Sequence, residues 1–283
     1  MSDNITTWDP PGDYTDWYNA AYWTNGVPDR DKIAVVPKHT VSTDNKDVAV
    51  KELRVLGSGW VSVAEVTAEK VLVADDGQFD ASTITVSDEF RFAGGQVSSF
   101  GGLNVPPTAT LRIEGTDKKE FNAHGQSIRV RGKGVLNFKG HHLNITGDLD
   151  IDITGVVEVD EEAKFEGAGS VSNSGRLEIA APMHLLQGVD LKNSDLGTLQ
   201  IAIPDHTAAQ LPRITLESDN SCYLDGKLVL ALGFEPADGA SVQVLSYSQY
   251  HRQGKFTEIE SVASGFRWQA NYGETALSVT RLP

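Results

Sequence analysis

LNITGDLDIDITG, residues 143–155, sets the architecture of this chain, because leucine and isoleucine alternate with polar residues and glycines punctuate the alternation. Alternation at period two is typical of a β-strand with one buried face. Similar short segments, most of them ended by glycine or another turn residue, run almost without interruption from Ile33 to Ile179. Strands this short, this numerous and this evenly spaced predict an all-β fold, a parallel β-solenoid in which each coil of about 20 residues stacks on the next.

Three zones follow one another along the chain. Residues 1–32 are rich in aromatic and turn residues, and we expect them to form an aromatic N-terminal cap, because a solenoid leaves an open apolar end and unpaired strand edges. Residues 33–221 hold the β-solenoid repeats. Residues 222–283 contain longer and more regular strands, and we expect them to form a C-terminal β capping module.

Composition narrows the class of protein. The chain has 283 residues, 40% of them hydrophobic, so it can bury a large core. Its formal net charge of -15 repels nucleic acid and anionic membranes, so we expect neither nucleic-acid binding nor membrane insertion. Cys222 is the only cysteine, which excludes an intrachain disulfide.

The first residues carry no recognisable export signal. Met1-Ser2-Asp3-Asn4 lacks the basic and apolar regions of a signal peptide. Two alternatives stay open: a signal that is missing from this chain, or another route, such as assembly into a phage-like particle.

Four stretches resemble bacterial surface β-solenoid proteins of the adhesin and autotransporter-passenger type. They are WTNGVP at 23–28, FAGGQVSSFGGL at 92–103, GSVSNSGRL at 169–177, and the whole of 226–279. The resemblance implies a right-handed β-helix with the C-terminal capping module of that group. Phage receptor-binding spikes and β-helical polysaccharide-degrading enzymes share these features, so the resemblance implies an architecture and leaves the activity open.

Two groups of acidic residues are candidates for cation binding. Asp75, Asp76 and Asp80 surround a turn, as oxygen ligands of Ca²⁺ do, although their spacing is not that of an EF-hand. A solvated turn is the alternative. Asp148, Asp150 and Asp152 alternate with aliphatic residues, which places them on one face as a negative strip. Such a strip can discourage aggregation, hold a divalent cation, or supply a carboxylate pair for sugar chemistry. We expect no cofactor other than Ca²⁺ at such a site.

Histidines and arginines supply the only plausible catalytic set. His124 and the pair His141 and His142 are separated by close to one coil, so their side chains can stack, and Arg129 and Arg131 alternate on one face nearby. This set could serve an enzyme that acts on an acidic polysaccharide. Structural or merely exposed histidines are the favoured interpretation.

The aromatic residues of the N-terminal zone allow two interpretations. Trp17, Tyr18, Tyr22 and Trp23 can plug the open end of the solenoid or form a platform on which sugar rings stack. The plug is the simpler role. If the rings instead form a platform, these four residues are the candidate ligand-binding set.

The sequence favours a binding or structural role over catalysis. We expect a non-enzymatic, adhesin-like protein, extracellular, at the cell surface or associated with a particle, that binds glycans or a host-surface receptor or serves as a rigid element. The alternatives are a β-helical lyase or glycoside hydrolase, a phage-type receptor-binding protein, and a structural subunit that forms homo-oligomers through a solenoid face.

Overall fold

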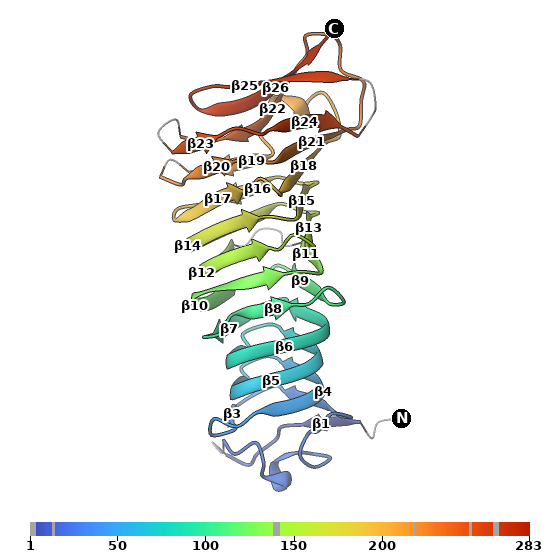
Figure 1. Cartoon of the computed structure of the whole chain (residues 1–283). Coiled ribbons are helices and arrows are strands. Elements are labelled where there is room, and N and C mark those ends of the chain that lie inside the picture. Colours follow the sequence, from blue (N-terminus) through green and yellow to red (C-terminus); the bar gives the residue numbers. More distant parts are fainter. Residues whose placement is uncertain (1–3, 13–14, 138–141, 218, 249–250, 263–265) are drawn as a thin grey trace.

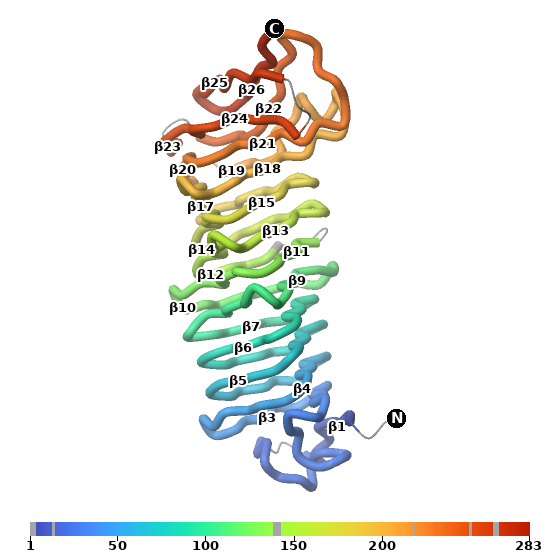
Figure 2. Tube along the Cα trace, turned by 45° about the vertical axis from the view of Figure 1, so that its right-hand side comes forward, coloured from blue at the N-terminus to red at the C-terminus, as the bar shows by residue number. Residues whose placement is uncertain are grey.

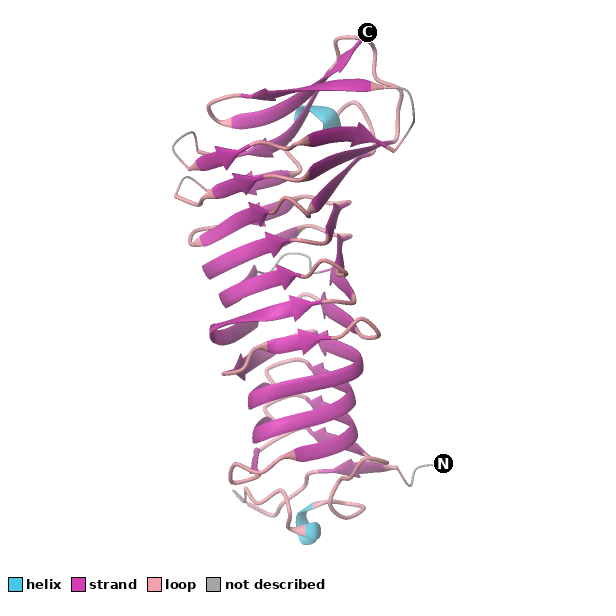
Figure 3. Cartoon of the chain, in the orientation of Figure 1, coloured by secondary structure: helices cyan, strands magenta, loops and turns pink. Residues whose placement is uncertain are grey.

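The computed structural model describes residues 4–12, 15–137, 142–217, 219–248, 251–262 and 266–283. They form an elongated rod of stacked strands (Figure 1). Helix is limited in these residues to two short 3-10 turns, Ala20–Tyr22 and Ala208–Gln210 (Figure 3). No helix in this part of the chain is long and apolar enough to span a membrane. The expected all-β parallel β-solenoid is confirmed, and its right-handed sense stays a prediction.

Three faces wrap around the rod, and each is a ladder of parallel strands from successive coils (Figure 2). Face A consists of β1 (Ile5–Thr7), β2 (Ile33–Val36), the ends of β4 (Val48–Val55), β5 (Trp60–Val73) and β6 (Gln78–Phe92), then β9 (Thr110–Glu114), β11 (Lys133–Asn137), β13 (Val156–Val159), β15 (Arg176–Ile179), β18 (Thr198–Ile203), β21 (Lys227–Leu232) and β24 (Glu258–Ser261).

Face B follows face A in each coil. It consists of β3 (Thr40–Ser42), the starts of β5 and β6, β7 (Gly95–Ser99), the starts of β10 (Lys119–Val130), β12 (His142–Ile151) and β14 (Ala163–Asn173), then β16 (Met183–Leu185), β19 (Ile214–Leu216) and the end of β22 (Ser241–Ser246).

Face C closes each coil. It consists of the start of β4, the middle of β5 and β6, β8 (Leu103–Val105), the ends of β10, β12 and β14, then β17 (Val189–Asn193), β20 (Cys222–Leu224) and β23 (Arg252–Gly254).

The coils repeat in register. On face A, parallel pairing connects the residues at one position through seven turns: Ile33, Glu52, Lys70, Glu89, Thr110, Lys133, Val156 and Arg176. Pairing then continues to Thr198 and, over two longer coils, to Lys227 and Glu258; the first of these longer coils accommodates the loop that contains the 3-10 turn Ala208–Gln210.

Aliphatic and aromatic side chains stack inside the rod because the register is kept from coil to coil. The residue after each face A position points inward and is buried, so the inner column reads Ala34, Leu53, Val71, Phe90, Leu111, Gly134, Val157, Leu177, Leu199 and Leu228. Each coil buries its apolar face against its two neighbours, which is how a solenoid is stabilised.

Aromatic side chains close the N-terminal end, as expected. Trp8, Trp17 and Trp23 are buried, and the Trp23 ring packs against the rings of Trp8 and Trp17 with centroids 5.1 and 4.9 Å apart. The indole Nε1 of Trp23 donates a hydrogen bond to the Trp17 carbonyl oxygen at 2.8 Å. β1 pairs with β2 and adds a strand to the edge of face A. The cluster therefore covers the open core that the first coil would expose.

Antiparallel strands close the C-terminal end. β26 (Ala276–Leu282) pairs antiparallel with β22 and with β25 (Arg267–Tyr272), which ends the parallel stacking. Parallel coils extend beyond residue 222, because β20, β21, β23 and β24 all continue the three ladders. The division into zones at 32/33 and 221/222 stays a prediction.

Truncation of an inner side chain tests the stacked column. Phe90→Ala should lower the free energy of unfolding by about 3–5 kcal/mol, because its ring is buried between Val71 and Leu111 on neighbouring coils. Chemical denaturation followed by circular dichroism measures the loss. Phe100→Ala is the matched control, because that ring is 65% exposed, and it should cost less than about 1 kcal/mol. Equal losses in the two variants would contradict the stacked column.

Candidate functional site

One row of outward side chains runs along face B, and we call it the B ladder. Alternation places every second residue of a strand outside, and the parallel register aligns these residues from coil to coil. Strand pairing connects Trp60, Gln78, Gln96, Glu120, Asn144 and Glu166. Phe165 pairs with Leu185, and Leu185 pairs with Leu216 on the next coil. The residue after each of them is therefore aligned as well, so Leu186 and Glu217 follow Glu166 in the ladder.

Three hollows open along the B ladder, and we call them together the B trough. Their volumes, from the N-terminal side, are about 350, 160 and 640 Å³. Neighbouring hollows share lining residues: Gln96 and Glu120 line the first and second, and Asn144 lines the second and third. The hollows therefore follow one another over one row of amide and carboxylate groups.

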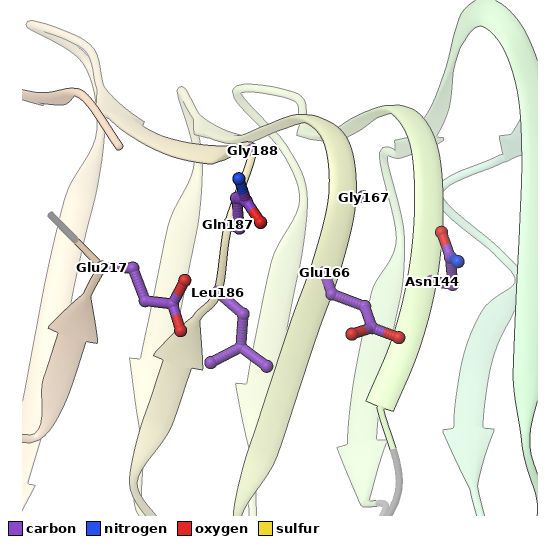
Figure 4. Close-up of a pocket in the computed structure, with 7 residues that line it drawn as sticks. All are labelled: Asn144, Glu166, Gly167, Leu186, Gln187, Gly188 and Glu217. Carbon is purple, nitrogen blue, oxygen red and sulfur yellow. The ribbon is translucent and has the colours of Figure 1, made fainter. Parts of the chain in front are cut away.

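The third hollow is the largest and is drawn in Figure 4. Leu186 lies between Glu166 and Glu217 there, and Asn144 lies beyond Glu166. Gln187 also lines the hollow. The hollow thus combines two carboxylates, two amides and one aliphatic side chain, which is a mixture of hydrogen-bonding groups and apolar surface.

Glycines at the corner between faces B and C keep this hollow open. Gly147, Gly167 and Gly188 have φ values of 119°, 125° and 85°, which other residues rarely adopt. A Cβ atom on Gly167 would lie 2.2 Å from the Ile145 carbonyl oxygen, and one on Gly188 would lie 1.9 Å from that of Gly167. Side chains are therefore excluded from this corner, and the third hollow extends over it.

A second group of polar and aromatic residues flanks the N-terminal half of the B trough. Trp60 is 40% exposed, and its Nε1 donates a hydrogen bond to Asp80 Oδ2 at 2.7 Å. On the next rungs, Ser98 Oγ lies 2.9 Å from His124 Nε2, and the His124 ring stacks on Phe100 with centroids 3.9 Å apart. Two exposed aromatic surfaces, Trp60 and Phe100, thus lie beside the trough.

Burial changes the acidity of one carboxyl in this group. It raises the pKa of Asp80 above its ordinary value, while the hydrogen bond from Trp60 and the nearby His124 act in the opposite direction. The net direction is upward, so the Asp80 carboxylate carries an uncompensated desolvation cost at neutral pH.

The four aromatic residues proposed for ligand binding do not share one exposed surface. Trp17 and Trp23 are buried in the cap. Tyr22 packs edge-on against Trp8, with centroids 5.6 Å apart. Tyr18 is 42% exposed, and its hydroxyl donates a hydrogen bond to the Asp47 carbonyl oxygen. The contacts of these rings are those of a plug.

The residues proposed for metal binding lie in two different settings. Asp75 and Asp76 are exposed on a turn, where Asp75 Oδ2 accepts a hydrogen bond from the Gly57 amide. Asp80 lies on face B and contacts Trp60. Within the described residues, no group of three or more His, Cys, Asp or Glu side chains is arranged to hold a metal ion.

The acidic strip of β12 contacts neighbouring coils. Asp148 Oδ1 accepts a hydrogen bond from Ser170 Oγ at 2.7 Å. Asp150 and Asp152 pair with Arg129 and Arg131, each at 3.6 Å. The strip is therefore balanced by cationic and hydroxyl groups from the adjacent rungs of face C.

The proposed catalytic set is not brought together among the residues that the structure describes. His124 faces Ser98 and Phe100 beside face B, whereas Arg129 and Arg131 form ion pairs along face C. His141 and the His142 side chain lie outside the described residues.

Sequence reasoning missed the B ladder. Its members are the outward residues Trp60, Gln78, Gln96, Glu120, Asn144 and Glu166, of which only Trp60 and Asn144 lie in segments that alternation had marked as strands. The sequence does contain a signal for it, because a polar or aromatic residue recurs at intervals of 18 to 24 residues, as the paired positions show. Finding it requires the exact length of each coil, which alternation does not give.

Removing the charge of Asp80 tests the electrostatics of this region. Asp80→Asn should raise the melting temperature relative to the parent more at about pH 7 than at about pH 3. A carboxyl with a raised folded-state pKa favours folding below its unfolded pKa, and this contribution is lost as pH rises through the folded pKa. Asparagine still offers an oxygen to Trp60. A variant that is less stable than the parent mainly at neutral pH would contradict the assigned direction.

Comparison with known proteins found no matching family model, no matching curated protein and no matching solved structure.

Proposed function

We propose that this β-solenoid binds an extended polysaccharide along the B trough, as an adhesin-like protein of a cell surface or a particle. The observation that carries the proposal is the coincidence of three hollows with one ladder of stacked side chains on a single face. A long polymer, unlike a compact ligand, can occupy all three hollows at once.

The spacing of the ladder supports a repetitive ligand. Neighbouring rungs of a parallel sheet are about 4.8 Å apart, close to the advance of one sugar along an extended chain. Each rung offers one polar side chain, with Gln96, Asn144 and Gln187 supplying amide donors and acceptors. Many weak contacts at a fixed interval add up along a polymer because binding of one unit raises the effective concentration of the next.

The chemistry of the lining supports a glycan over a protein partner. Sugars present hydroxyl edges and apolar ring faces, which match amide groups beside exposed aromatic rings such as Trp60 and Phe100. Face A has fewer polar side chains available to a sugar, because ion pairs within and between its strands occupy its outward charges. Arg54 with Glu52, Arg112 with Glu89, and Lys133 with Glu158 are examples, at 2.6 to 2.9 Å.

A specific observation favours polysaccharide cleavage as the second candidate. Glu166 and Glu217 line one hollow and lie two rungs apart, about 9.6 Å along the stack. Carboxyl groups of inverting glycoside hydrolases are separated by about 6.5–9.5 Å, slightly less than this rung spacing, so the two side chains would have to lean toward each other for such a role. Release of reducing ends from an oligosaccharide that the protein binds would establish this activity and replace the binding role.

Substitution in the trough tests the binding role. Asn144→Ala removes an amide that lines two of the hollows, and it should lower the affinity for a bound oligosaccharide by about tenfold, the loss of one net hydrogen bond. A glycan array identifies a ligand, and isothermal titration calorimetry measures its affinity. The matched control is Asn104→Ala, the same change at an exposed position on face C, and it should bind as the parent does. Retention of full affinity by Asn144→Ala, or equal losses in both variants, would exclude the B trough.

A further inference from the structure

We infer that a hollow on face C is a second ligand site, which binds one neutral sugar unit against the ring of Tyr223. This C hollow lies at the ends of β14, β17 and β20, which follow one another along the rod (Figure 1). Its volume is about 480 Å³, within the range of small-molecule sites. None of its described lining residues lines the B trough, so the inference stands independently of the proposed function.

Tyr223 supplies the aromatic surface of the C hollow. Its side chain is 37% exposed and lines the hollow. The ring offers an apolar face and a polar hydroxyl edge, which match the C–H face and the hydroxyl edge of a sugar. Strand pairing aligns Tyr223 with a row of outward residues on face C: Thr67, Thr85, Asn104, Arg129, Asp150, Ser172, Lys192 and Gln253. This row has a single ring, so it suits one sugar unit and not a stacked polymer.

The charged groups that line the C hollow are partnered and of opposite sign. The Lys192 ammonium group donates a hydrogen bond to Ser170 Oγ at 3.2 Å, and this hydroxyl donates in turn to Asp148 Oδ1 at 2.7 Å. Asp225 Oδ1 accepts a hydrogen bond from the Gly226 amide at 2.7 Å. One ammonium group and one carboxylate thus line the hollow. This balance favours a neutral polar ligand, and the net charge of -15 disfavours an anion.

The same groups retain hydrogen-bonding capacity for sugar hydroxyls. An ammonium group has three donors, and the Lys192 ammonium group uses one of them within the described part of the chain. The Ser194 hydroxyl donates to Ser174 Oγ at 3.1 Å, and each of these oxygens can also accept a hydrogen bond. A sugar hydroxyl both donates and accepts, so it can accept from Lys192 while it donates to Asp225 or to a serine.

Two buried asparagines connect the three strands that form the C hollow. Asn173 Nδ2 donates a hydrogen bond to Asn193 Oδ1 at 2.7 Å, and Asn193 Nδ2 donates to the Asp225 carbonyl oxygen at 2.7 Å. These bonds run from the end of β14 to the end of β17 and on to the residue after β20. The lining residues are therefore held in position before a ligand arrives, which lowers the entropic cost of binding.

Simple glycosides test the inference. Methyl β-glucoside, methyl β-galactoside, methyl α-mannoside and methyl β-N-acetylglucosaminide are added separately to the full chain, and saturation-transfer difference NMR measures their binding. At least one of them should bind, with a dissociation constant on the order of 1 mM, as expected for so small a ligand. Methyl β-glucuronide, which carries a carboxylate on the glucose ring, should bind no more tightly than methyl β-glucoside.

Substitutions locate the bound glycoside. Tyr223→Ala removes the stacking surface and should weaken binding by about tenfold, whereas Tyr223→Phe keeps the ring and should retain most of the affinity. Lys192→Met removes the ammonium donors at an exposed position and should also weaken binding by about tenfold.

Matched controls change similar side chains outside the C hollow. Leu196→Ala truncates an apolar side chain that is 60% exposed on the corner beside the hollow, and Lys51→Met removes an exposed ammonium group elsewhere. Both variants should bind the glycoside as the parent does. Melting temperatures establish that each variant is folded, and Lys192→Met decides the test if Tyr223→Ala does not fold.

The outcomes separate the inference from the proposed function. Absence of saturation transfer to all four neutral glycosides overturns the C hollow as a sugar site and leaves the B trough untouched. Binding that Asn144→Ala weakens and Tyr223→Ala leaves unchanged places the glycoside in the B trough, and it also overturns the inference. Equal losses in Tyr223→Ala and Leu196→Ala do the same. Tighter binding of the glucuronide than of the glucoside overturns the assignment of a neutral ligand.

Discussion

Parallel hydrogen bonding between coils, in a register that keeps inward residues over inward residues, is the constraint on which this molecule is built. A shift of one residue would turn every inward side chain outward, so the apolar residues of each coil fix the position of the next coil. The inner column from Ala34 to Leu228 shows the result, since each buried residue pairs with the residue at the same position in the next coil, with Gly134 as the one member that has no side chain. Neighbouring coils supply the burial that a single coil lacks.

The same register orders the outer surface. Residues that alternate with the core must also stack, so every face carries rows of side chains one rung apart. On face A, the rows carry charges of both signs and form ion pairs such as Arg112 with Glu89. On face B, the row is rich in amides and carboxylates, and stacked glycines at the adjoining corner exclude side chains. A trough forms on that face because the glycines at its corner have no side chains to fill the space beside the polar outer row.

Both ends of the rod need a different solution, because the terminal coils have a neighbour on one side only. Buried tryptophans cover the N-terminal opening, and antiparallel pairing of β26 with β22 and β25 ends the stack at the other side. Arg252 lies over the rings of Tyr247 and Tyr272, which ties the last coils to the antiparallel strands. Covered ends limit the exposed strand edges through which solenoids aggregate.

Local alternation was enough to predict the stacked parallel strands and the presence of β-structure at the C-terminus, because period two and glycine punctuation are properties of neighbouring residues. The aromatic cap was predicted from the aromatic residues concentrated in residues 1–32. The B ladder was beyond that reasoning. Glu120 and Asn144 are 24 residues apart, whereas Trp60 and Gln78 are 18 apart, and only the folded coils bring them to the same position. Coil length varies with loops and bulges, so which polar side chains meet, and whether a hollow forms between them, is decided by three-dimensional stacking.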